Sequence, residues 1–138
     1  HAPVAQLNEQ LEAPIDSFFD RLTPERSFWR LGWGILDTAD RYTPLDGTAA
    51  PRPVDPAPDQ FFLRVERETL RRFPETNCVL FTIRTYVAPI LAAADDRDVA
   101  RRLADSLSAL PDDVRGYKDL RTTADALIAT LRGTLRKT

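Results

Sequence analysis

The sequence predicts an α+β fold, in which antiparallel strands form one sheet and helices precede and follow it. Residues 27–37 alternate between large apolar side chains and other residues, which is the period of a strand. Residues 63–73 alternate charged and apolar side chains, and residues 79–86 are almost continuously β-branched or aromatic. Turn-forming residues at 74–77 separate these two segments, as in a hairpin.

The N-terminal region is predicted to form two helices, near residues 5–12 and 14–22. Apolar side chains recur there every three or four positions. Pro14 would separate the two helices, because proline is favoured in the first turn of a helix and lacks an amide hydrogen. The chain begins with His1 and contains no methionine, so we expect a preceding segment, now missing, that completes the sheet.

The strand at 27–37 should have one heavy aromatic face and one face with room. The aromatic face carries Trp29, Leu31, Trp33 and Ile35, and we expect its two tryptophans mainly in the core. Gly32 and Gly34 share the other face. Either this face packs against a helix or a bulge, or a flat ligand approaches it closely.

Residues 38–60 form a long Pro-rich connection without an apolar period. A loop of this length is either functional or mobile. The strands on its two sides need one another, so residues 1–138 should form a single domain or the C-terminal part of one.

Helices are predicted at 89–110 and from about 117 or 122 to 135. Asp95–Asp98 interrupts the first of them, with Asp96 as the cap of the following helix. The apolar stripe predicted to be buried consists of Leu91, Val99, Leu103, Leu107, Leu110, Leu120, Leu127, Leu131 and Leu135.

Composition excludes several classes of function. The formal charge of −2 gives no electrostatic reason to expect binding to nucleic acid. No apolar run approaches the roughly 18 residues of a membrane helix. The one cysteine, Cys78, cannot form an internal disulfide, which fits a reducing, cytoplasmic location. It opens an apolar strand, so we expect it to be buried.

Common catalytic signatures are absent from the sequence, which has no Gly-rich phosphate loop, no paired cysteines and no HExxH motif. What remains is a concentration of arginine on the hairpin, together with Glu66 and Glu68. Strand-borne arginine suits bidentate recognition of carboxylates. The alternative is a set of cross-strand Glu–Arg pairs that only stabilises the hairpin.

Several segments together resemble a known family. They are the run from Arg64 to Pro74, the strand from Phe81 to Tyr86, the His-Ala-Pro-Val start, residues 15–33, and the pair Tyr117-Lys118. In this order they resemble the haem-dependent oxidative N-demethylase family over nearly the whole chain, which would correspond to the C-terminal half of a typical member. The resemblance implies a PAS-like fold that holds b-type haem.

The resemblance also implies an activity. Such an oxygenase uses O₂ to remove a methyl group from a small secondary alkylamine, such as dimethylamine, and releases formaldehyde. A separate reductase component carrying FMN and a 2Fe-2S cluster would supply the electrons.

Five residues receive roles through the resemblance. His1 matches the family's His-x-Pro-Val element and would be the proximal haem ligand, unless it is a terminal residue without a role. Glu66 would pair with an alkylammonium substrate. Arg67 and Arg84 would bind the haem propionates. Tyr86 would donate a hydrogen bond in the pocket or pair with backbone.

Two positions depart from the family's usual pattern. Glu68 stands where Gln is usual, and Gly32 stands where Asn is usual. An added carboxylate near Glu66 would perturb an amine site by like-charge repulsion. Two alternatives therefore stay open: a haem-binding PAS-like sensor or carrier without turnover, and an interaction domain without haem.

Overall fold

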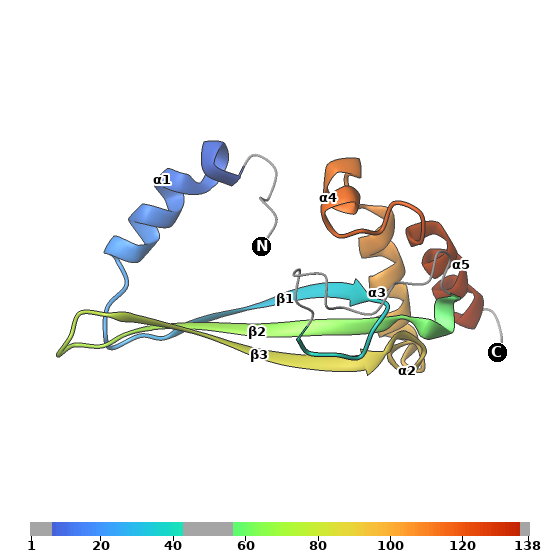
Figure 1. Cartoon of the computed structure of the whole chain (residues 1–138), viewed down its shortest axis with the longest axis horizontal. Coiled ribbons are helices and arrows are strands. Elements are labelled where there is room, and N and C mark those ends of the chain that lie inside the picture. Colours follow the sequence, from blue (N-terminus) through green and yellow to red (C-terminus); the bar gives the residue numbers. More distant parts are fainter. Residues whose placement is uncertain (1–6, 43–56, 136–138) are drawn as a thin grey trace. The chain divides into compact units, whose positions relative to one another are not determined.

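A computed structural model describes residues 7–42 and 57–135 of the chain (Figure 1). The helices are α1 (Leu7–Asp20), α2 (Ile90–Ala93), α3 (Arg97–Ser108), α4 (Asp112–Tyr117) and α5 (Ala124–Leu135). The strands are β1 (Phe28–Leu36), β2 (Phe62–Arg72) and β3 (Val79–Pro89), and Pro58–Gln60 forms a short 3-10 helix, η1.

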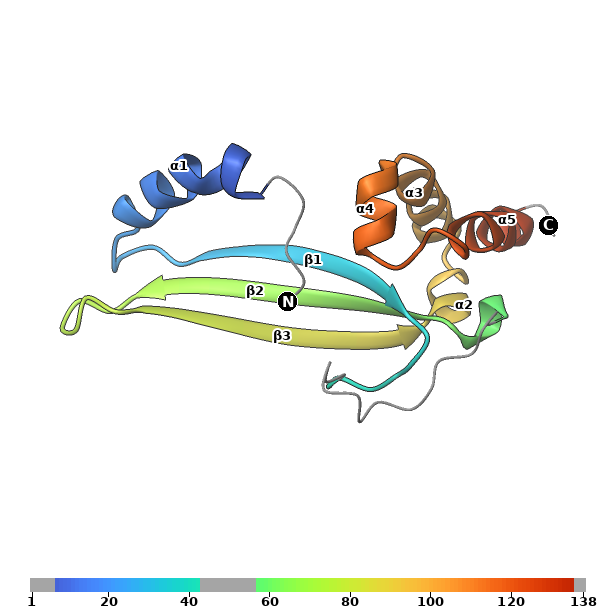
Figure 2. The same ribbon diagram turned by 45° about the horizontal axis from the view of Figure 1, so that its top comes forward.

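The strands form one sheet in the order β1-β2-β3. The arrow of β2 runs opposite to those of β1 and β3, so neighbouring strands are antiparallel (Figure 2). The predicted α+β class is confirmed, with helices before and after the sheet. The PAS-like assignment stays a prediction.

The hairpin between β2 and β3 closes where the sequence predicts. The backbone N–H of Phe73 donates to the Cys78 carbonyl at 2.9 Å, and that of Asn77 donates to the Phe73 carbonyl at 3.0 Å. Asn77 has a φ of 56°, a left-handed conformation that asparagine adopts more readily than most residues. The predicted burial of Cys78 is wrong, because this residue belongs to the exposed end of the hairpin and precedes the first residue of β3.

The chain divides into two compact units. Unit 1 contains residues 1–32 and 65–85, and unit 2 contains residues 33–64 and 86–138. The prediction of a single domain stays a prediction. Most of the predicted 38–60 loop, residues 43–56, lies outside the described part of the chain, and its end forms η1.

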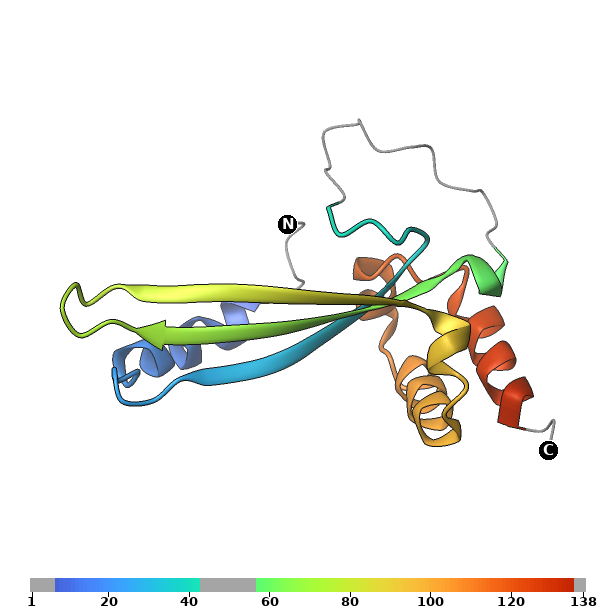
Figure 3. The ribbon, with the colours of Figure 1, turned by 90° about the horizontal axis from the view of Figure 1, so that it is seen from below.

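Unit 2 contains a hydrophobic core. The helices α3 and α5 pack against each other (Figure 3). Their buried apolar side chains meet those of the strand ends and of Leu120. The core consists of Ile35, Phe61, Ile90, Ala94, Ala100, Leu103, Ala104, Leu107, Leu120, Ala124, Leu127, Ile128 and Leu131, with Trp33, Leu63 and Leu110 packed against it.

The predicted apolar stripe is confirmed in its centre and wrong at its start. Leu103, Leu107, Leu120, Leu127 and Leu131 are buried. The side chains of Leu91 and Val99 are instead 36% and 40% exposed. Small residues of α3, Ala100 and Ala104, occupy the buried face in their place, because a short side chain lets two helices approach closely.

The helix α1 is continuous, so the predicted break at Pro14 is wrong. Proline removes one backbone hydrogen bond, but its φ is compatible with a helix, and α1 runs through it. No helix within residues 7–42 and 57–135 has the length and apolar character needed to cross a membrane.

The predicted cap of α3 is confirmed. The Asp96 carboxylate accepts the backbone N–H groups of Asp98 at 2.9 Å and of Val99 at 3.1 Å. We expect Asp96→Ala to lower the free energy of unfolding by about 1 kcal/mol, measured by urea denaturation. The matched variant Asp95→Ala should change it by less than about 0.5 kcal/mol, and equal losses would contradict the capping role.

Candidate functional site

Unit 1 contains a cavity of about 680 Å³ between α1 and one face of the sheet. This volume lies within the range of small-molecule pockets. The residues that line it are Pro14, Ile15, Phe18 and Phe19 of α1, Phe28, Trp29 and Arg30 of β1, Glu68 and Leu70 of β2, and Val79 and Phe81 of β3. We call this cavity the α1 pocket.

An aromatic contact joins α1 to β1. The ring of Phe18 meets the rings of Phe28 and Phe19 edge to face, with centroid distances of 5.2 and 5.8 Å. Such pairs stabilise packing beyond the area that they bury. The wall of the α1 pocket is therefore held partly by the same rings that line it.

Arg72 of β2 holds the C-terminal end of α1. Its Nη2 donates to the Phe19 carbonyl and its Nε to the Leu22 carbonyl, both at 2.7 Å. Its Nη1 donates to Asn77 Oδ1 at 2.6 Å. One guanidinium thus joins a carbonyl in the last turn of α1 and a carbonyl just beyond the helix to the hairpin turn.

One ion pair interrupts the apolar lining. Arg30 Nε donates to Glu68 Oε2 at 2.5 Å. The Arg30 side chain is 80% exposed, whereas that of Glu68 is only 15% exposed. The pocket therefore holds a largely buried carboxylate whose described cationic partner reaches it from solvent.

The two departures from the family's usual pattern are neighbours in space. A Cβ atom at Gly32 would lie 3.7 Å from Glu68 Oε1, an ordinary van der Waals distance. That oxygen is the one described atom outside the adjoining residues within 4 Å of this position. Gly32 thus leaves space beside the second oxygen of Glu68.

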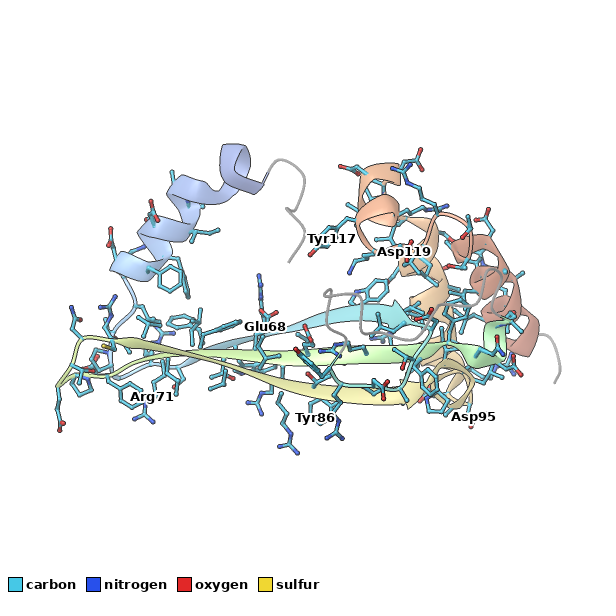
Figure 4. All side chains as sticks on the ribbon, in the orientation of Figure 1. Glu68, Arg71, Tyr86, Asp95, Tyr117 and Asp119 are labelled. Atoms are coloured by element: carbon cyan, nitrogen blue, oxygen red, sulfur yellow. The ribbon has the colours of Figure 1, made fainter. Side chains whose placement is uncertain are left out.

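The residues predicted for substrate and haem lie on different faces of the sheet. Alternation along β2 places Glu66 on the face of Glu68 and Leu70, and Arg67 on the opposite face. Figure 4 shows Glu68 on the side of α1 and Arg71 on the other side. Since Phe81 lines the pocket, the same alternation along β3 directs Arg84 away from it.

Individual environments follow from these placements. Glu66 is half-buried, and Arg84 is exposed. The guanidinium of Arg67 lies 5.1 Å from the centroid of the Trp29 ring, which is 60% exposed. Tyr86 belongs to unit 2 and is 44% exposed, and His1 lies outside the described residues.

The expected aromatic face of β1 serves two purposes. Trp33 packs against the core of unit 2, where Lys118 Nζ donates to its carbonyl at 2.7 Å and lies 4.9 Å from its ring centroid. Trp29 is instead exposed, so its expected place in the core is wrong; it borders the α1 pocket, but its ring contacts Arg67 on the opposite face of the sheet. Two segments that carry the family resemblance, around Trp33 and Tyr117-Lys118, therefore meet in unit 2.

Sequence reasoning missed the pocket and the role of Arg30. Phe18 and Phe19 had a detectable signal, because their helical spacing indicates a face that must pack on something. Arg30 had none, since an arginine at a strand position usually faces solvent. Within residues 7–42 and 57–135, no three His, Cys, Asp or Glu side chains are grouped as metal ligands.

Comparison with protein families gives a match to most of the chain. The sequence model described as "Haem-dependent oxidative N-demethylase, alpha subunit-like" matches residues 1–128. This description supports, at the level of the family, a haem-dependent oxidoreductase with more than one component. The chain belongs to the family of haem-dependent oxidative N-demethylase alpha subunit-like proteins.

Proposed function

We propose that the protein is the oxygenase component of an oxidative N-demethylase that acts on a small methylated amine. The observation that supports this most directly is the α1 pocket, an apolar cavity of about 680 Å³ whose described lining includes one carboxylate, in a chain of this family. For dimethylamine the net reaction consumes O₂, two electrons and two protons, and yields methylamine, formaldehyde and water.

The lining of the α1 pocket fits a porphyrin ring. Flat apolar ligands require apolar and aromatic walls, and the pocket offers Phe18, Phe28, Leu70 and Phe81. Bound haem would supply O₂ activation. We propose that His1 would hold the haem iron, because it matches the His-x-Pro-Val element of the family.

The chain's own residues would bind and orient the amine. The apolar walls exclude water, and an alkylammonium in such a site needs a carboxylate to balance its charge. Both Glu66 and Glu68 lie on the pocket side of β2. A reductase with FMN and a 2Fe-2S cluster is the proposed source of electrons.

The first experiment is an absorption spectrum of the purified protein with and without haemin, repeated for His1→Ala. A Soret band that shifts or disappears in the variant would support haem and its ligand. A band that is identical in both proteins would show that His1 is not the haem ligand. Absence of a band from wild type would overturn the proposed function.

A matched pair of variants tests which face of the sheet binds the ring. Phe81 lines the α1 pocket, and its neighbour Leu80 lies on the opposite face, while their side chains are similarly exposed, at 51% and 46%. We expect Phe81→Arg to weaken haemin binding by about tenfold or more, because it replaces an apolar ring of the wall with a charged guanidinium. Leu80→Arg should leave haemin affinity unchanged.

If Leu80→Arg weakens haemin binding and Phe81→Arg does not, the porphyrin ring binds to the face of the sheet opposite the α1 pocket. Arg67, which lies there, and Arg84 would then be the natural partners of the propionates. Turnover is tested separately by formaldehyde release from dimethylamine with O₂ and a reductant. Haem binding without formaldehyde would favour the sensor or carrier function.

A further inference from the structure

A carboxylate with little access to solvent lies in the aromatic α1 pocket. The Glu68 side chain is 15% exposed, and the other described lining residues apart from Arg30 are apolar. An isolated negative charge in apolar surroundings is costly, so this position favours a cation beside it. Arg30 supplies that cation through the contact of its Nε with Glu68 Oε2.

The second oxygen of Glu68 has room beside it. Oε1 faces the place that a side chain at position 32 would occupy, and Gly32 leaves that place empty. This place lies next to Glu68, which lines the pocket. A small donor can therefore reach this carboxylate at a site that asparagine or a larger residue would fill.

The cation already present can be exchanged for another one. Because the Arg30 side chain is 80% exposed, its guanidinium can turn into solvent when a second cation takes its place beside Glu68. An alkylammonium in its place would keep the charge balance and add methyl contacts with the rings of Phe28 and Phe81, which also line the pocket. Aromatic rings attract methylated ammonium ions in this way.

We infer that Glu68, rather than Glu66, is the residue that binds a small methylated ammonium ion, and that Arg30 is an internal cation which this ligand displaces. The inference rests on the proposed function for the choice of amine. The inference also assigns a joint role to Gly32 and Glu68. Together they would form a site for a cation, where the usual Asn and Gln would form a neutral site.

The test measures the dissociation constant of dimethylammonium chloride from the purified protein by calorimetry. Sodium chloride keeps the ionic strength constant, and propan-2-ol serves as an uncharged probe of similar size. We expect Glu68→Gln to weaken binding at least about tenfold, because it removes the charge partner. The matched variant Glu66→Gln should change the dissociation constant by less than about threefold, since it keeps that partner.

Arg30 and Gly32 test the exchange itself. Arg30→Met should strengthen binding up to about fivefold, since it removes a weak competitor. Gly32→Asn should weaken binding about tenfold by filling the space beside Oε1. Thermal unfolding of each variant verifies that the protein is folded.

Three results would overturn the inference: equal losses in the two glutamate variants, weaker binding in Arg30→Met, or equal affinity for propan-2-ol. Haemin absorption measured on the same samples separates this proposal from the proposed function. If the amine binds in a way that depends on Glu68 but no Soret band appears, only the proposed oxygenase function is contradicted. If a Soret band appears but amine binding does not change in Glu68→Gln, only the proposed cation site is contradicted.

Discussion

Arg72→Met is expected to lower the free energy of unfolding by about 3 kcal/mol, because it removes several hydrogen bonds from a charged donor at once. The guanidinium of Arg72 contacts the carbonyls of Phe19 and Leu22 and the side chain of Asn77. Urea denaturation measures the loss, and hydrogen exchange of the α1 amides locates it. Because α1 forms one wall of the α1 pocket, haemin affinity should fall as well.

The neighbouring residue gives the control. Arg71 is exposed, and its guanidinium lies 5.6 Å from the centroid of the Phe73 ring. An exposed contact of this kind contributes roughly 1 kcal/mol or less, so Arg71→Met should leave both stability and the exchange of α1 nearly unchanged. If the two variants lose the same stability, Arg72 does not hold the helix in place.

Leu107→Ala should also cost about 3 kcal/mol, within the usual range for a leucine removed from a packed core. Leu107 is fully buried in unit 2 on the face of α3 that packs against α5. The loss combines the apolar area returned to water and the cavity left behind. Urea denaturation monitored by circular dichroism measures it.

Leu91 is the matched leucine outside the core. Its side chain is 36% exposed, so Leu91→Ala should cost less than about 1 kcal/mol. A cost for Leu91 equal to that for Leu107 would mean that the predicted stripe, and not the observed one, is the buried face.

Local patterns were sufficient for most of the secondary structure. Alternation predicted β1, turn-forming residues predicted the hairpin at Asn77, and a carboxylate at the right spacing predicted the cap at Asp96. Each of these depends on residues close in sequence, so the physical cause is visible in the chain itself. The continuous α1 was missed because packing overrides the local preference of a proline.

The residues of the candidate site were identified only in part. The sequence indicated Glu66, Glu68 and a group of arginines on strands, but not how these divide between the two faces of the sheet. The division follows from the alternation of β2 and β3 combined with the side on which α1 packs. The side of the sheet on which α1 packs is decided by the tertiary structure. From the sequence, Glu66 and Arg67 were therefore expected in one site, whereas the structure places them on opposite faces of β2.

The sequence was enough to establish the α+β class, the hairpin, the family and the unusual pair Gly32 and Glu68. Tertiary structure alone decided that these two residues lie side by side, that Arg30 pairs with the carboxylate, and that Phe18 and Phe28 line a pocket with it. The physical reason is the separation along the chain of the residues that interact. Periodicity and turns act between neighbours in the chain, whereas Arg30 and Glu68 are 38 positions apart and meet only after β1 pairs with β2.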